Sequence, residues 1–307
     1  MTRESIETPP GPDGIELLQA SFNRHVYDRH MHDTYAIGVT LRGVQRFWCR
    51  GVTHDSTPGH VLVIRPGEVH DGRSGSAGGY AYRMLYVRPE IVDAIADETG
   101  GRRSDLEVAG PLVCDRTAFD LLNAGWSALA RSPRSLASDE LLLRGVSALA
   151  LGRRASIEAP AGGHDRALDH VRDYLHANIE RSVTMSELAA IASMSRFQLT
   201  RRFQRRYGLP VYSYLRHLRL EEAKRRLARG QEIAAVAVDL GFVDQSHFHR
   251  RFRRSYGMTP GQWRRAWHGA CPRPGLSLPP AWPKPALGLA SKARTWIQDR
   301  AAVRGVP

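Results

Sequence analysis

Hydrophobic and polar positions change their period along this chain of 307 residues. Between about Ser21 and Arg88, short runs rich in β-branched and aromatic residues alternate with glycine-containing turns. These runs are Tyr35–Leu41, Gln45–Cys49, His60–Ile64 and Tyr82–Val87. Short strands at nearly regular spacing predict a small sandwich or barrel.

After Pro89 the period becomes helical. Segments 116–131 and 136–152 predict amphipathic helices, the first with Phe119, Leu122, Trp126 and Leu129 on one face. These helices either pack on the barrel or also offer a surface for dimerisation, and the sequence leaves both possibilities open. From His164 to His268 nearly all of the pattern is helical.

The fold class that follows is α+β, in two domains. We expect a flexible N-terminus over 1–14, a barrel over 15–112, a helical region over 113–154, a linker over 155–163, an all-α domain over 164–268 and a proline-rich tail over 269–307.

Charge divides the chain in the same way. Residues 1–163 hold 18 Arg and no Lys against 20 acidic residues, whereas residues 164–268 hold 20 basic against 10 acidic residues. The asymmetry predicts a polyanionic partner for the helical part alone. Cys49, Cys114 and Cys271 lie far apart, which argues against disulfides and cysteine-bound zinc. With no apolar run that could span a membrane and no signal peptide, we expect a cytoplasmic protein without membrane contact.

Two similar helical units lie within the basic part, over 187–208 and 234–257. Matching Glu187 to Glu232 gives an offset of 45 for the short helices, and the longer helices match at 49, so the second turn would be four residues longer. Ser195 and Asp244 are good N-caps, and Gly208 and Gly257 end the longer helices. An apolar stripe follows each cap, formed by Leu199, Phe203 and Tyr207 and by Phe248, Phe252 and Tyr256. Each unit is therefore predicted to be a helix-turn-helix.

The other face of each longer helix is rich in arginine, from Arg196 to Arg206 and from Arg250 to Arg254. Phosphates would neutralise this charge. Among the arginines lie side chains able to bond base edges: Gln198, Thr200, Gln204, Gln245, Ser246 and His249. A solvated basic face is the alternative, and the repetition of caps, stripes and stops disfavours it. Between the units, 211–230 predicts one helix with Leu215, Leu218, Ala223 and Leu227 inward. A rod of ~30 Å is close to the ~34 Å of one DNA turn, so the two units are expected in successive major grooves.

The second unit resembles the AraC-type (AraC/XylS) transcription regulators. The residues that carry the resemblance are Ile233, Ala237, Gly241-Phe242, Asp244–Phe248, Arg250, Phe252, Gly257, Thr259-Pro260 and Arg264. The first unit matches more loosely, and Ser193 stands where the family usually has a turn glycine, at some backbone cost. The resemblance and the arginine pattern together give the expected DNA-binding residues: Arg196, Phe197, Thr200, Arg201, Arg205, Gln245, Ser246, His249 and Arg250.

The family often pairs this module with an N-terminal cupin-like effector domain, and His30–Tyr35 and Gly59–His70 look like the two cupin motifs. His30 and His32 lie two apart on a predicted strand and would share a face, where His70 could complete a three-histidine metal set. The glutamate and asparagine of metal-binding cupins are absent. We therefore expect no cofactor and histidines that bond a ligand or pack, with a divalent metal as the less favoured alternative.

An effector pocket is expected inside the barrel, for a small polar or anionic molecule. Its expected lining is His32, Tyr35, Arg46, Trp48, His70, Tyr82 and Arg83. An ordinary barrel interior is the alternative for each of these residues.

The function that follows is a sequence-specific, double-stranded-DNA-binding transcription regulator that responds to a small-molecule effector. We expect it to activate transcription with RNA polymerase, as a homodimer on paired sites, and not to be an enzyme, since no general acid or base accompanies the histidines. Two alternatives are a metal-dependent cupin enzyme that carries a DNA-binding module, and a sequence-neutral architectural DNA binder.

Overall fold

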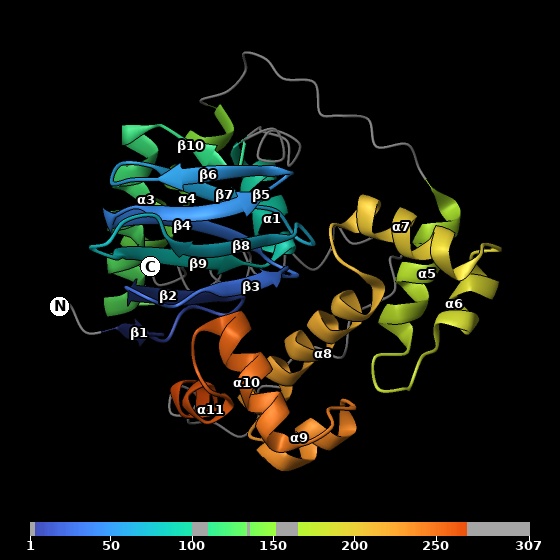
Figure 1. Cartoon of the computed structure of the whole chain (residues 1–307). Coiled ribbons are helices and arrows are strands. Elements are labelled where there is room, and N and C mark those ends of the chain that lie inside the picture. Colours follow the sequence, from blue (N-terminus) through green and yellow to red (C-terminus); the bar gives the residue numbers. More distant parts are fainter. Residues whose placement is uncertain (1–3, 100–109, 134–135, 152–164, 269–307) are drawn as a thin grey trace, which may run out of the picture.

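The structure is a computed structural model that describes residues 4–99, 110–133, 136–151 and 165–268 (Figure 1). The described residues up to 151 form a β-rich part and residues 165–268 form a helical part, which confirms the predicted α+β, two-domain fold class. The expected linker 155–163 and tail 269–307 lie outside the described residues. No helix in the described ranges is long and apolar enough to cross a membrane.

Two antiparallel sheets form the N-terminal part. One has the order β1-β2-β9-β4-β7-β10 and the other β3-β8-β5-β6. The strands are β1 Ser5–Glu7, β2 Ile15–Phe22, β3 Tyr27–His30, β4 Tyr35–Gly43, β5 Gln45–Cys49, β6 Val52–Ser56, β7 Val61–Ile64, β8 His70–Ser74, β9 Tyr80–Val87 and β10 Leu112–Val113. Strand β1 pairs with Gln19–Ser21 of β2, although residues 1–14 were expected to be flexible.

Three helices cover one face of the larger sheet: α1 Pro89–Thr99, α3 Arg116–Arg131 and α4 Leu136–Leu151 (Figure 1). Asp115 caps α3 by accepting a hydrogen bond from the Ala118 N–H. The predicted apolar face of α3 packs in one core with residues of β4 such as Tyr35 and Ile37. The helices therefore pack on the barrel, and a role in dimerisation stays a prediction.

The space between the two sheets is filled by side chains, several of them aromatic. The larger side chains in this core are Phe22, Tyr27, Phe47, Tyr80, Tyr82 and Met84. The hydroxyls of Tyr27 and Tyr82 lie 2.9 Å apart, and the rings of Tyr80 and Tyr82 stack at 5.6 Å. Tyr27 and Tyr82 fit this apolar space because each packs its ring there and satisfies its hydroxyl with the other.

The helical part contains α5 Arg166–Ala177, α6 Met185–Ile191, α7 Arg196–Tyr207, α8 Val211–Ala228, α9 Ile233–Asp239, α10 Gln245–Tyr256 and α11 Pro260–His268. Helix α8 runs between the two helix-turn-helix units, α6–α7 and α9–α10 (Figure 1). Its first half, Val211 to Leu218, packs in one core with α7, and its second half, Leu220 to Leu227, packs in another with α10. The residues predicted to face inward on this helix are all buried.

The alignment of the two units differs from the predicted one. Helices α6 and α9 begin at Met185 and Ile233, an offset of 48, and α7 and α10 match at 49, so the second turn is longer by one residue rather than four. Glu187 lies inside the first turn of α6, in a capping box with Thr184, whereas Glu232 is the N-cap of α9. Matching the two glutamates was therefore wrong, because they hold different helix positions.

In the corrected alignment, Ser193 of the first unit is equivalent to Gly241 of the second. Both adopt the left-handed conformation, with φ of 51° for Ser193 and 69° for Gly241. The backbone cost expected at Ser193 follows from this geometry, because a side chain in the left-handed region costs about 1–2 kcal/mol.

This cost predicts that Ser193→Gly stabilises the chain. After the extra freedom of glycine in the unfolded state is subtracted, we expect the free energy of unfolding to rise by about 0.5–1 kcal/mol. Gly241→Ala should lower it by at least about 0.5–1 kcal/mol, because the same balance applies in reverse and the new Cβ would also approach the Arg219 guanidinium to 2.9 Å. Urea denaturation of the full chain measures both, with Ser193→Ala as a control of nearly unchanged stability. A destabilising Ser193→Gly would contradict the account of this turn.

Candidate functional site

The two recognition helices, α7 and α10, begin and end in the same way. The Ser195 hydroxyl accepts from the Gln198 N–H at 3.2 Å, and the Gln198 carboxamide accepts from the Ser195 N–H at 3.1 Å. Asp244 caps α10 by accepting from the His247 N–H at 2.6 Å. Gly208 and Gly257 end the helices in the left-handed conformation. The carboxamide oxygen of Gln198 therefore belongs to the capping box, and a base contact by this exposed side chain stays a prediction.

The expected DNA-binding residues are accessible. Arg196, Phe197, Thr200, Arg201, Arg205, Gln245, Ser246 and Arg250 are exposed, and His249 is half-buried. Phe197 is 74% exposed, although the other phenylalanine of α7 is fully buried. An exposed aromatic ring beside arginines on such a helix suits apolar contact with a thymine methyl group. Arg201 and Arg250 hold equivalent positions at the offset of 49.

The arginines do not all share this face. Arg202 makes an ion pair of 2.6 Å with Asp165, and Arg251 and Arg254 lie 3.9 Å from Asp28 of β3. The barrel thus covers one flank of α10 and leaves the side with Gln245, Ser246 and Arg250 open. The arginine density predicted from the sequence therefore serves two purposes, DNA contact and packing against acidic partners within the chain.

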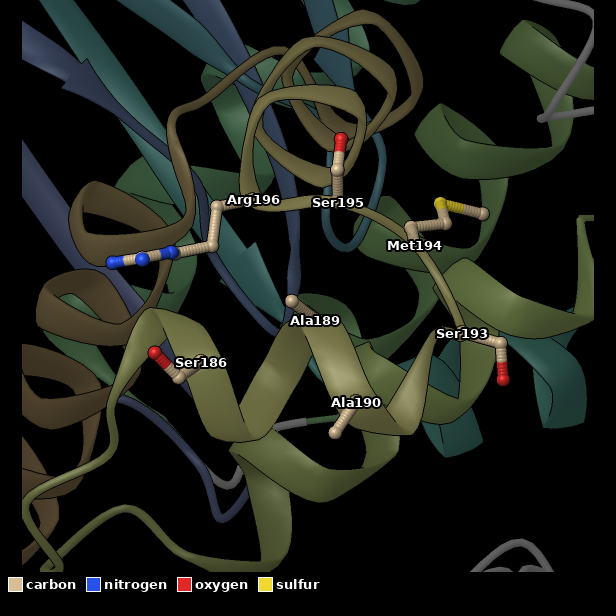
Figure 2. Close-up of a pocket in the computed structure, with 7 residues that line it drawn as sticks. All are labelled: Ser186, Ala189, Ala190, Ser193, Met194, Ser195 and Arg196. Carbon is tan, nitrogen blue, oxygen red and sulfur yellow. The ribbon is translucent and has the colours of Figure 1, made fainter.

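A shallow hollow of about 510 Å³ lies beside the first recognition helix. Figure 2 shows its lining: Ser186, Ala189 and Ala190 on α6, Ser193 and Met194 in the turn, and Ser195 and Arg196 at the start of α7. Small side chains on α6 leave this surface open. The hollow belongs to the helix-turn-helix and not to the barrel.

Only part of the expected effector lining lies together. The His32 and His70 rings are 5.1 Å apart, and Tyr82 lies inside the barrel. Tyr35 packs in the core under the helices. Arg83, on the same face of the sheet, bonds Asn123 and Ser127 of α3.

The remaining two residues of the expected lining lie on β5. Arg46 pairs with Asp55 of β6, and Trp48 packs against the core of the helical part. Phe47 and Cys49, the alternate residues of this strand, face the barrel interior. Neighbours in a strand point to opposite faces, so Tyr82 and Arg83 cannot line one pocket. The lining predicted for Tyr35, Arg46, Trp48 and Arg83 therefore needs correction.

The three histidines of the cupin-like motifs do come together. One nitrogen from each of His30, His32 and His70 lies within 4.8 Å of the others. Burial lowers the pKa of all three rings, and for His30 and His32 the neighbouring His70 lowers it further. They are therefore neutral at neutral pH, since their ordinary value is about 6.5.

Helix α8 reaches these histidines with polar residues that sequence reasoning missed. Glu221 lies 3.4 Å from His32 Nδ1, and it also accepts a hydrogen bond of 2.8 Å from the Tyr256 hydroxyl of α10. Lys224 lies 3.2 Å from Glu16 of β2 and 3.6 Å from Glu221. Burial works to lower the pKa of Lys224, but the two carboxylates outweigh it and raise that pKa. We call Glu16, His32, Glu221, Lys224 and Tyr256 the interdomain network. It joins the barrel to both α8 and α10.

A second ion pair, between Arg225 and Asp33 at 2.8 Å, lies beside the interdomain network. Nothing in the local sequence distinguishes Glu221 or Lys224 from ordinary charged residues of an amphipathic helix. Their role in the domain contact becomes apparent only from the structure, in which they contact Glu16 and His32 of the barrel.

The fold and the site define a two-domain transcription regulator, with a ligand-binding barrel and a DNA-binding double helix-turn-helix. An AraC-like ligand binding domain matches residues 14–146, and a helix-turn-helix domain matches residues 188–266. The chain therefore belongs to the AraC family of transcription regulators.

Individual relatives support this family assignment. The HTH-type transcriptional regulator YbfI of Bacillus subtilis is 24% identical over 72% of this chain and 81% of its own length. The arabinose operon regulatory protein of Escherichia coli is 28% identical over 75% of this chain and 80% of its own. A crystal structure of an apo variant of ToxT from Vibrio cholerae shares the fold, with a TM-score of 0.58 at 14% identity over 84% of this chain and 99% of that one.

Arg201→Ala and Arg250→Ala are each expected to weaken binding to a DNA site selected from random sequence by about 1–3 kcal/mol and to relax preference at one base position. Equilibrium binding to the selected site and to its single-base variants measures both effects. Arg202→Ala and Arg251→Ala are matched controls, because these neighbouring arginines face acidic residues of the chain, and their loss should be smaller. An equal loss on all sequences for Arg201→Ala and Arg250→Ala would contradict base reading.

Proposed function

We propose that this regulator activates transcription as a homodimer on paired DNA sites, and that an effector bound in the barrel changes how the DNA-binding domain is held. The observation that carries the proposal is the interdomain network. One helix, α8, supports both recognition helices and also contacts the ligand-binding domain through Glu221 and Lys224. A ligand that alters the barrel side of this contact would act on both DNA-reading units at once.

The effector is a small molecule that binds the barrel near His32, His70 and Tyr82, and because side chains fill the space between the sheets, its binding requires those side chains to rearrange. ToxT, whose fold this chain shares, has been solved with an unsaturated fatty acid bound. That finding supports a small-molecule ligand for a chain of this fold. The histidines and tyrosines here favour a ligand that carries hydrogen-bonding groups.

Activation, with RNA polymerase as partner, is supported by relatives that are named transcriptional activators, such as RhaS of Klebsiella pneumoniae, which is 30% identical over 41% of this chain. The proposed homodimer rests on the frequency of two-fold oligomers among soluble proteins. A regulator rather than an enzyme is the function that these relatives support.

A map of bound sites across the genome, followed by reporter assays at those promoters, tests the proposal. We expect discrete sites, reporter output that rises with the regulator, and a response to a compound related to the neighbouring genes. Uniform, sequence-independent coverage would indicate an architectural DNA binder instead. A ligand-insensitive output equal to that of a 165–268 fragment would contradict the sensing role.

Glu16→Gln tests the interdomain network in the full chain. It removes the charge of the barrel residue that pairs with Lys224, while Glu221 stays in place. Couplings between sites commonly change affinity about 5–150-fold, and we expect the effector-dependent change in DNA affinity to disappear in this variant. Asp55→Asn is the matched control, because Asp55 pairs with Arg46 on the barrel surface, and it should keep the wild-type response. An unchanged response in Glu16→Gln would mean that the signal takes another route.

A further inference from the structure

The three histidines of the barrel share a hydrogen-bonding arrangement. Nδ1 of His30 bonds the Asp28 carbonyl at 2.7 Å, and Nδ1 of His70 bonds the Glu68 carbonyl at 3.0 Å. Nδ1 of His32 faces the Glu221 carboxylate at 3.4 Å. An acceptor at Nδ1 places the proton there and leaves Nε2 as the free lone pair. Metal-bound histidines almost always use their second nitrogen in this way, toward a carbonyl or a carboxylate.

A fourth histidine approaches from the DNA-binding domain. His217 of α8 is 2% exposed, and its ring centre lies 6.2 Å from that of His30. The ring donates a hydrogen bond to the backbone of Arg29, while its Nε2 is buried without a hydrogen-bond partner among the described residues. A buried polar atom without a partner costs free energy, so its place beside three other imidazoles calls for an explanation.

Packing alone does not account for four neutral imidazoles gathered at one domain contact. Hydrogen bonds fix the rings of His30 and His70 from outside the cluster, and their centres lie only 4.3 Å apart. Burial lowers the pKa of His217 to about 4, so this ring is neutral as well. Metal binding requires a free lone pair on each ring, and the hydrogen bonds at Nδ1 leave Nε2 of His30 and His70 available for it.

We propose that the contact between the barrel and α8 binds one divalent transition-metal ion through His30, His32 and His70, with His217 of α8 as the fourth ligand. Imidazole ligands suit zinc, nickel, copper and iron. Metal–nitrogen bonds of about 2.0–2.1 Å would draw the four rings closer together than they now lie. Glu221 would then orient His32 as an outer carboxylate, and its other contacts lead to Lys224 and Tyr256.

Such a site deepens the proposed function, on which this part of the inference rests. A metal held by three barrel residues and one α8 residue would fix α8 against the ligand-binding domain. Metal occupancy would thereby control the same domain contact as the interdomain network.

Zinc binding to the untagged, full-length chain tests the site. After treatment with a chelator, the protein is titrated with Zn²⁺ in competition with a chromophoric chelator. We expect one ion per chain in the wild type. His70→Ala and His32→Ala should weaken zinc binding by at least about 10–100-fold, the loss that removal of even an outer-sphere partner causes. His217→Gln should weaken it as well.

His60→Gln is the matched control. His60 lies in the same barrel and bonds Thr57, away from the cluster, so this variant should bind zinc as the wild type does. Thermal unfolding of each metal-free variant shows whether it is folded. Zinc should raise the melting temperature of the wild type and of His60→Gln but not of His70→Ala. Co²⁺ absorption in the visible range gives a second readout of the same coordination.

Two results would overturn the proposal. One is a wild type that does not bind one zinc ion per chain in the titration. The other is folded His32→Ala and His70→Ala variants that bind zinc as tightly as His60→Gln does. DNA binding is measured on the same samples, which separates the two hypotheses. Sequence-specific binding without a zinc site contradicts the metal proposal alone. One zinc ion per chain without sequence-specific DNA binding contradicts the proposed function alone.

Discussion

The packing of α8 is the constraint on which the rest of the structure depends. Leu215 and Leu218 complete the core under the first recognition helix, and Leu220, Ala223 and Leu227 complete the core under the second. A helix-turn-helix cannot bury its apolar stripe alone, and here one rigid rod of 18 residues supplies the missing surface to both units. Its length, about 27 Å at 1.5 Å per residue, sets the separation of the two reading helices.

The same helix also meets the barrel, through charged and polar residues. Buried charges are tolerated only when they are paired, and removing one partner leaves the other uncompensated. The contact between Lys224, Glu16 and Glu221 is therefore expected to be lost as a unit when one charge is removed, unlike a hydrophobic contact, which weakens gradually as area is lost. In the proposed function, a ligand that disturbs one member would favour a different placement of α8, and two such placements are the kind of bistable element that allosteric regulators use. Strands of the barrel, α8 and the second recognition helix α10 meet at this contact, so it is well placed to carry a signal.

Much of the fold was predictable because it is encoded locally. The segment 116–131 has the pattern of a helix and is observed as Arg116–Arg131, and the N-caps Ser195 and Asp244 are found where the polar residues precede an apolar stripe. The alignment of the two units failed at Glu187 and Glu232, because similar letters hold different positions in the two short helices. Repeats of caps and stripes are thus more reliable than repeats of single residues.

The candidate ligand site was less predictable, for two physical reasons. Both faces of the larger sheet are covered, so hydrophobicity alone does not show that Tyr35 faces the helices and Tyr82 the interior. The second reason is distance along the chain. Glu221 lies 189 residues from His32 in the sequence, and no local pattern announces a contact that only the packing of two domains creates.

The central prediction, that α8 places the two recognition helices in successive major grooves of one duplex, is tested most directly by hydroxyl-radical footprinting of the full chain on a selected site. The account predicts two protected segments on one face of the duplex, about 10 base pairs apart for each bound chain. A single protected segment per chain, or two segments on opposite faces of the duplex, would contradict it.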